Sequence, residues 1–150
     1  MSSLKPCVVA VIPALNEAVV IATVVHAIRA AHDGLLVRHV IVCDNGSTDD
    51  TAREALRAGA IVVSEPTRGY GAACLAALRV IDDLKLGADI VLFVDGDGSV
   101  KACEAAALVQ RVVDGADLVI GARAPDLQAA RALTWPQRAG NAVACVMIRA

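Results

Sequence analysis

Two aspartates, Asp95 and Asp97, follow the apolar run IVLFV with only Gly96 between them. Carboxylates this close repel each other unless a positive charge lies between them. A divalent cation relieves that repulsion, because Mg²⁺ binds one or two carboxylates and takes its other ligands from water and phosphate oxygens. Asp-Gly turns that bind no metal are also common. The pair therefore indicates a cation site, with a diphosphate as the natural partner of the metal.

Polar side chains also follow the other apolar runs of the sequence. They lie in the segments PALNE, DNGSTD, EPTRGYG and GAR, which contain Glu17, Asp44, Arg68 and Arg123. In an open α/β sheet, ligands bind beyond the carboxyl ends of the strands. We therefore expect these side chains to meet the aspartate pair at one edge of a sheet.

Several of these polar residues also have a purely structural explanation. Asn16 and Ser47 stand where they could cap the helices that follow them, and Asp49 could complement a helix dipole. The glycines of RGYG could serve only to allow a tight turn. Arg68 could reach a phosphate or form a surface ion pair. The sequence leaves these alternatives open.

The elements that must position these residues alternate between strand and helix. Short apolar runs predict five strands, the fourth of them central, at 7–13, 37–44, 60–64, 88–95 and 116–123. Apolar residues at helical spacing predict a helix after each strand, the first over 17–31 and the last from Trp135 onward. This alternation is typical of an α/β fold with a mostly parallel sheet and helices on both faces. We expect one domain over residues 1–150.

The composition narrows the class of protein. Hydrophobic residues make up 57% of the 150-residue chain, which is enough for a folded core, and the net charge is −2. The sequence therefore lacks the basic stripe that binds a nucleic-acid backbone. It has one Phe, one Tyr and one Trp, too few for the stacking platforms of single-strand binders. We expect no nucleic-acid partner.

The cysteines and the N-terminus bear on the location of the protein. None of the five cysteines forms a CxxC pair, which argues against zinc-ribbon and thioredoxin-like sites. Most lie in apolar runs, where a reduced cysteine acts as a small hydrophobic residue. The first apolar stretch is too short for a signal peptide, and no window reaches the roughly 18 apolar residues of a membrane span. We expect a cytoplasmic protein, either soluble or peripheral at the inner membrane face.

The two commonest nucleotide-binding motifs are missing from the expected positions. A dinucleotide-binding fold needs GxGxxG after the first strand, where this sequence has PALNEA, and no GxxxxGK[ST] loop occurs. A nucleotidyltransferase would carry a glycine-rich, basic segment near the first strand. A phosphatase of the haloacid dehalogenase type would place its aspartate pair after the first strand. Neither pattern is present.

Five segments together resemble family 2 glycosyltransferases, which have the Rossmann-like GT-A fold. PALNE, DNGSTDDT, RGYGAA, VDGDGS and IGAR occur in the order of that family, over residues 7–141. The sequence is most similar to the branch that includes dolichol-phosphate mannose synthase and polyprenyl-phosphate glucosyltransferases. The resemblance implies a metal-dependent enzyme that moves a sugar from a UDP- or GDP-sugar to an acceptor. A polyprenyl phosphate at the membrane surface is one acceptor that it implies.

The resemblance also implies which residues bind the nucleoside. Pro13, Leu15 and Glu17 would contact the base or the ribose, and Asp44 would bond the base. The family usually has a second aspartate where this chain has Asn45. The resemblance implies little effect of that change, because the first position makes the contact with the base.

On the diphosphate side, the resemblance assigns the cation to the aspartate pair. Asp97 would bind Mg²⁺ or Mn²⁺ directly, while Asp95 would face the ribose and sugar or a metal-bound water. Gly96 would let the backbone approach the ligand closely, and Ser99 would add a weak metal contact. Arg123 would face the diphosphate or the donor sugar.

The C-terminal part departs from the family pattern. Relatives usually continue well beyond the Gly-Asn pair found here at 140–141, and that part commonly supplies acceptor contacts and the general base. This sequence ends nine residues after Asn141, so it identifies no base. Either the chain is a natural short form, or it is a fragment that lacks the acceptor part. The alternative function is a sugar-nucleotide-binding module without turnover. The apolar stretch NAVACVMI would then need a membrane surface or a partner chain, such as a second copy.

Overall fold

The computed structural model of the chain describes residues 6–30, 37–99 and 102–121. By its internal contacts the chain divides into two units, Met1–Val119 and Ile120–Ala150. Every helix and strand given below belongs to the first unit. The helix expected from Trp135 onward lies outside the described residues, and the expectation of one domain stays a prediction. Within the described part of the chain, every helix is too short or too polar to span a bilayer.

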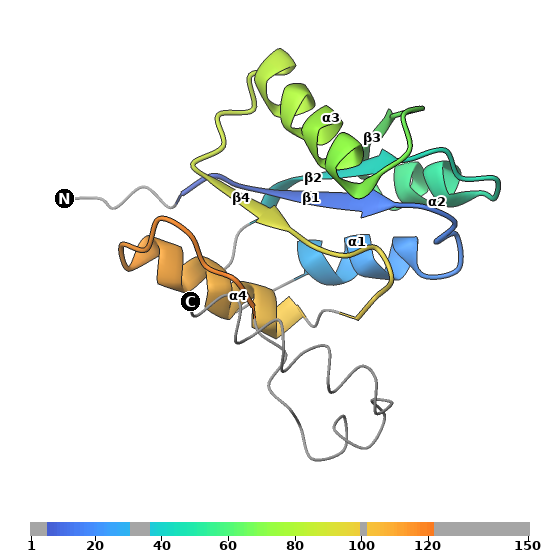
Figure 1. Cartoon of the computed structure of the whole chain (residues 1–150). Helices are drawn as coiled ribbons and strands as arrows, with labels where there is room; N and C mark the ends of the chain where they lie inside the picture. Colours follow the sequence, from blue (N-terminus) through green and yellow to red (C-terminus); the bar gives the residue numbers. More distant parts are fainter. Residues whose placement is uncertain (1–5, 31–36, 100–101, 122–150) are drawn as a thin grey trace, which may run out of the picture. The chain divides into compact units, whose positions relative to one another are not determined.

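Four of the five predicted strands form one parallel sheet (Figure 1). Their order across the sheet is β3-β2-β1-β4. The strands are β1 (Val8–Ala14), β2 (Val37–Asp44), β3 (Ile61–Ser64) and β4 (Ile90–Phe93). Because all neighbouring pairs are parallel, the carboxyl ends of the four strands share one edge.

The register of the sheet brings three strand ends level with one another. Ala14, the last residue of β1, pairs with Asp44 of β2, and Asp44 pairs in turn with Ser64 of β3. On the other side of β1, Val11 pairs with Phe93, so β4 ends three positions earlier. The residues that follow β4 therefore run beside the last residues of β1.

Helices cover both faces of the sheet, which confirms the predicted architecture. In Figure 1, α3 lies on one face, and α1 and α4 lie on the opposite face. Buried residues of α2 belong to the same core cluster as those of α1 and α4. The helices are α1 (Ile21–Arg29), α2 (Thr51–Arg57), α3 (Tyr70–Asp83) and α4 (Ala102–Val113).

Alternate side chains of β1 enter two separate cores. Val8, Ala10 and Ile12 pack with α1, α2 and α4, whereas Val9 and Val11 pack with α3. Strand residues point alternately to opposite faces, and both faces are covered here. This arrangement explains why the strand reads as a continuous apolar run and not as an alternating one.

Two expectations about the sheet are wrong for the described residues. The expected fifth strand forms no ladder over 116–121, and its apolar side chains Leu118 and Ile120 are 77% and 80% exposed. A strand is stable only when a neighbour satisfies its backbone N–H and C=O groups, and this segment pairs with none of the four described strands. For the same reason β4 lies at an edge of the described sheet, and β1 and β2 are central.

Candidate functional site

A pocket of about 240 Å³ lies at the carboxyl edge of the sheet. Three parts of the chain form it, namely the end of β1, the first residue after β2, and the segment that leads into α3. The lining residues are Pro13, Ala14, Leu15, Asn45, Arg68, Gly69, Tyr70 and Ala73. Pro13 and Leu15, two residues singled out from the sequence, therefore form one wall.

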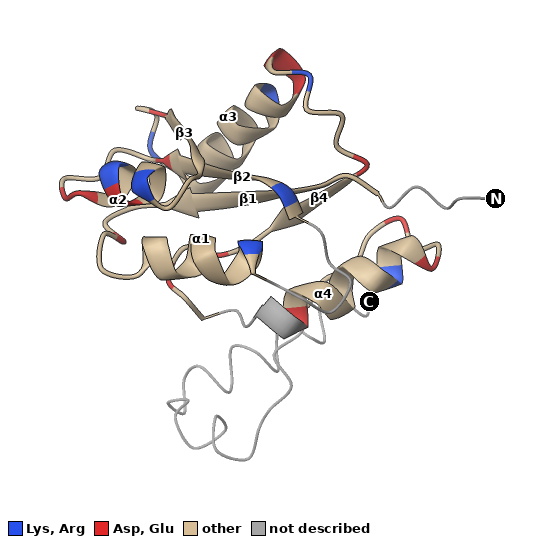
Figure 2. Ribbon diagram, turned by 180° about the vertical axis from the view of Figure 1, so that it is seen from behind, with Lys and Arg blue, Asp and Glu red and all other residues tan. Residues whose placement is uncertain are grey.

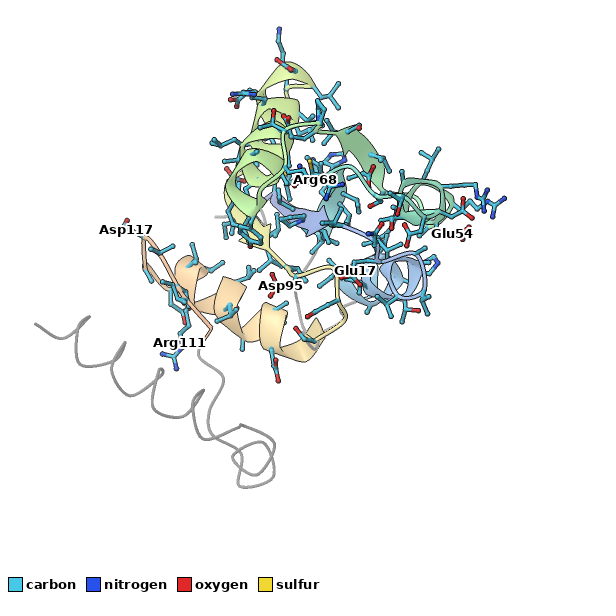
Figure 3. All side chains as sticks on the ribbon, turned by 45° about the vertical axis from the view of Figure 1, so that its right-hand side comes forward. Glu17, Glu54, Arg68, Asp95, Arg111 and Asp117 are labelled. Atoms are coloured by element: carbon cyan, nitrogen blue, oxygen red, sulfur yellow. The ribbon has the colours of Figure 1, made fainter. Side chains whose placement is uncertain are left out.

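Polar side chains from separate loops gather at this edge, as expected for parallel strands. Figure 3 shows Glu17, Arg68 and Asp95, which follow β1, β3 and β4, in the middle of the view. Basic residues elsewhere are scattered over the described elements (Figure 2). On α2, Arg53 and Arg57 pair with acidic neighbours and not with the pocket.

The loop after β1 is fastened to the loop after β2 by Asn16. Its backbone N–H donates to Ser47 Oγ at 2.9 Å, and its Oδ1 accepts from Thr48 N at 2.8 Å. Asn16 adopts φ +58°, a left-handed conformation that asparagine tolerates better than most residues. The helix-cap explanation of Asn16 and Ser47 is therefore wrong. α1 begins only at Ile21, and neither α1 nor α2 has a side-chain cap.

Asp49 and Thr51 hold the backbone of Glu17 in the same way. Thr51 is fully buried, and its Oγ1 accepts from Glu17 N at 2.8 Å. Asp49 accepts from the Thr51 hydroxyl, from Thr51 N at 3.0 Å and from Ala18 N at 3.2 Å. The hydroxyl bond first, and then the backbone bonds, lower the pKa of Asp49 below its usual value. Asp49 thus links two loops and does more than complement a helix dipole.

Asp44 lies at the end of β2 and is buried, with 8% of its surface exposed. Its Oδ1 accepts from Ser47 N at 3.3 Å, and its carbonyl oxygen accepts from Glu65 N at 3.0 Å. It does not line the pocket itself, but its sheet partner Ala14 and the next residue, Asn45, do. The structure therefore places Asp44 directly behind the pocket wall.

Asn45 lines the pocket, although the sequence led us to expect little effect of an asparagine at this position. Its carboxamide is buried and bonds three backbone groups of the β3–α3 loop, those of Glu65, Thr67 and Gly69. The sequence feature that could have indicated this role is the asparagine itself, because the family resemblance leads one to expect an aspartate at position 45. This loop also brings Arg68 and Tyr70 to the pocket. The sequence placed Arg68 at this edge but left it open between a phosphate contact and a surface ion pair, and it did not single out Tyr70.

Gly96 brings the aspartate pair close to the pocket wall. A Cβ atom at Gly96 would lie 3.1 Å from the carbonyl oxygen of Pro13 and 3.5 Å from Ala14 Cβ. The backbone between the aspartates therefore rests against the end of β1, with Asp95 and Asp97 exposed on either side. Glycine is required here for close approach to β1, whereas its expected approach to the ligand stays a prediction.

The charge of Asp95 reaches the first turn of α3. Burial raises the pKa of Tyr70, and the neighbouring Cys74 and Asp95 raise it further. Burial also raises the pKa of Cys74, with a bond from Tyr70 opposing the rise and Asp95 adding to it. Since Tyr70 lines the pocket, the carboxylate of Asp95 acts electrostatically on the pocket's α3 side.

The aspartate pair fits a hard divalent cation that takes its remaining ligands from a bound anion and from water. Among the described residues, no three His, Cys, Asp or Glu side chains are grouped so as to hold a metal by themselves. Mg²⁺ and Mn²⁺ need no such cage, because they accept one or two carboxylates together with phosphate and water oxygens. Asp97 Oδ1 accepts from Ser99 N at 2.8 Å, which orients the carboxylate. Arg123 lies outside the described residues.

Comparison with known proteins agrees with this geometry. The sequence pattern of Glycosyl transferase family 2 matches residues 9–145. An uncharacterised glycosyltransferase of Mycobacterium tuberculosis is 42% identical, with 86% of this chain and 52% of that protein covered. Glycosyltransferase AglJ of Haloferax volcanii is 37% identical, with 87% and 40% covered. The chain thus spans about half the length of these relatives, or less.

A solved structure extends the similarity to three dimensions. Glucosyl-3-phosphoglycerate synthase from M. tuberculosis, in complex with Mn²⁺, UDP-glucose and phosphoglyceric acid, superimposes with a TM-score of 0.61 at 36% identity. The match covers 73% of this chain and 40% of that one. The family pattern matches most of the chain, and the relatives and the solved structure agree with it. The sheet is parallel and has helices on both faces. The chain therefore belongs to glycosyl transferase family 2 and has the GT-A fold.

Proposed function

We propose that the chain binds a nucleoside diphosphate sugar at the carboxyl edge of its sheet and forms the donor site of a metal-dependent glycosyltransferase. The observation that carries the proposal is the contact of Gly96 with the end of β1. That contact sets two exposed carboxylates beside a pocket whose walls are Pro13, Leu15 and the start of α3. The nucleoside would thus bind in the pocket, and the diphosphate would bind beside it at the two carboxylates.

The pocket suits the nucleoside end of such a donor. Pro13 and Leu15 offer apolar surface to the flat base, and the adjoining Glu17 would accept bonds from the ribose hydroxyls. Asp44 lies directly behind this wall, from where its carboxylate would bond the polar edge of the base. We favour a UDP-sugar over a GDP-sugar, because the similar synthase binds UDP-glucose.

The diphosphate would lie between the aspartate pair and the N-terminus of α3. This helix has no acidic residue in its own first turn and no side-chain cap, so its own side chains do not neutralise the positive end of the helix dipole. Asp97 would hold Mg²⁺ or Mn²⁺, with Asp95 next to it, and Arg123 would add a charge-assisted bond to a phosphate. When bound, the cation would stabilise the negative charge that develops on the departing diphosphate.

The reaction itself would be transfer of the sugar to an acceptor oxygen. The bond between the anomeric carbon and the β-phosphate oxygen breaks, and its electron pair stays on the diphosphate. The acceptor oxygen forms the new bond to the anomeric carbon. We propose a polyprenyl phosphate as acceptor, presented at the inner membrane face. A phosphate monoester is largely ionised at neutral pH, so its oxygen can attack without a general base from the described residues.

Binding and transfer are tested in sequence. Isothermal titration of the 150-residue chain with UDP, with and without Mn²⁺, should show binding that depends on the metal. GDP and dTDP serve as controls for the base. A radiolabelled donor incubated with polyprenyl phosphate should then give a lipid-linked sugar. Absence of Mn²⁺-dependent binding with all three nucleotides would refute the proposal, and binding without transfer would reduce it to a donor-binding module.

A further inference from the structure

The carboxamide of Asn45 joins the end of β2 to the loop between β3 and α3. Its Nδ2 donates two hydrogen bonds, to the carbonyl oxygens of Glu65 at 2.9 Å and Thr67 at 2.7 Å. Its Oδ1 accepts one, from Gly69 N at 2.7 Å. Asn45 is only 6% exposed, so its carboxamide itself is largely shielded from water, although the three bonds are only partly buried. One side chain therefore fixes three backbone groups within five consecutive residues.

The pattern of these bonds requires an amide. A carboxylate has no proton to donate, so an aspartate at this position would place one of its oxygens, in the place of Nδ2, against the carbonyl oxygens of Glu65 and Thr67. Both carbonyls, which belong to the half-buried Glu65 and the exposed Thr67, would lose this partner, and the added negative charge would repel them. The family resemblance places an aspartate at position 45, and this chain's loop is held by bonds that an aspartate could not make.

The loop held in this way supplies one side of the pocket. Arg68, Gly69 and Tyr70 line the pocket, and Gly69 stands immediately before α3 with φ +135°. Asn45 lines the pocket as well and is anchored itself, because its backbone N–H donates to the carbonyl oxygen of Ala14 at 2.9 Å. A change in the carboxamide would therefore move the Arg68–Tyr70 wall relative to the β1 wall.

We propose that Asn45 is a positioning residue of this site, whose buried amide sets the conformation of Glu65–Gly69 and thereby the Arg68–Tyr70 side of the pocket. The consequence for nucleotide affinity rests on the proposed function. The effect on the loop does not, since it concerns the ligand-free chain.

Two isosteric substitutions test the proposal. Asn45→Asp removes both donated bonds, and Asn16→Asp is the matched control. Asn16 lies in an exposed loop, and the bonds that its side chain makes, from Thr48 N and Oγ1, are accepted by Oδ1, which a carboxylate can replace. The readouts are the rate of tryptic cleavage after the exposed Arg68 in the ligand-free chain, and the affinity for UDP with Mn²⁺.

Asn45→Asp should raise cleavage after Arg68 roughly tenfold, with little change at arginines on the helices, and should weaken UDP binding roughly tenfold. Asn16→Asp should leave both quantities within about twofold of the original chain. If Asn45→Asp does not fold, as judged by circular dichroism, Asn45→Ala takes its place, because it removes the three bonds without adding charge.

The outcomes separate positioning from a merely structural role. Equal acceleration at all tryptic sites, an unchanged rate after Arg68, or unchanged UDP affinity would overturn the proposal. If the original chain binds no UDP, the proposed function fails, and selective cleavage after Arg68 alone decides whether Asn45 positions the loop.

Discussion

Replacing Gly96 by alanine would place a methyl group 3.1 Å from the carbonyl oxygen of Pro13 and 3.5 Å from Ile12 Cγ2. Ordinary van der Waals contacts of a Cβ atom begin near 3.4 Å, so the turn must move away from β1 by a few tenths of an ångström. Overpacking of this kind costs about 1–3 kcal/mol, and the lower entropy of alanine in the unfolded chain offsets about 0.4–1 kcal/mol. We expect a net loss of about 1 kcal/mol in the free energy of unfolding.

The functional effect of Gly96→Ala should exceed the effect on stability. The unfolding temperature should fall by about 2–4 °C for a chain of this size. The displaced turn carries both Asp95 and Asp97, and a binding site tolerates misplacement of only about 0.5 Å, so Mn²⁺-dependent UDP affinity should fall roughly tenfold. Calorimetric titration and thermal unfolding measure the two quantities on one preparation.

Gly71→Ala is the matched stability control for this substitution. A Cβ atom at Gly71 meets nothing within 4 Å, and the residue lies inside α3, where alanine favours the helix over glycine. This variant should unfold at the original temperature or slightly above it. Wild-type UDP affinity in the Gly96→Ala variant would refute the reasoning that the turn must rest against β1 to present its carboxylates.

Three further predictions concern single carboxylates. Asp97→Ala should abolish the Mn²⁺-dependent part of UDP binding in calorimetry while the unfolding temperature stays within about 2 °C, because the residue is exposed; unchanged metal dependence would remove it from the metal site. Asp44→Ala should weaken binding of uridine more than binding of Mn²⁺-pyrophosphate, and equal losses would argue against a contact with the base. The folded-state pKa of Asp49 is lowered from 3.8, so its ionised form stabilises the fold fully above that pH and progressively less as the pH falls through the lowered pKa. In acid unfolding followed by circular dichroism, Asp49→Asn should lose this pH-dependent stabilisation. An acid unfolding profile identical to that of the original chain would contradict the stabilising role of ionised Asp49.

The sheet and the edge at which the pocket lies were predictable because they follow from local patterns. Apolar runs form the four strands, which end at Ala14, Asp44, Ser64 and Phe93, and a polar residue lies at each of these ends or within two residues of it. Since parallel strands share a direction, their polar ends must meet at one edge. That edge is where the pocket lies, with Pro13 and Leu15 in its wall.

The errors concern features that depend on distant partners. The run at 116–121 is apolar enough for a strand, but apolarity does not reveal whether a neighbouring strand is available. Asn16 resembles a helix cap in sequence, yet its bonds go to residues 31 and 32 positions away. The three bonds of Asn45 span 20 to 24 positions. Propensity arguments concern the nearest few residues and cannot detect such contacts.

The central claim is that Asp95 and Asp97 hold a divalent cation against a nucleoside diphosphate at the carboxyl edge of the sheet. The most direct measurement is an anomalous difference map from a crystal of the chain soaked with MnCl₂ and UDP. A manganese peak within coordination distance of an Asp97 carboxylate oxygen and a diphosphate oxygen, about 2.1–2.3 Å, is the predicted result. Ordered UDP in the pocket with no anomalous peak beside these aspartates would contradict the claim.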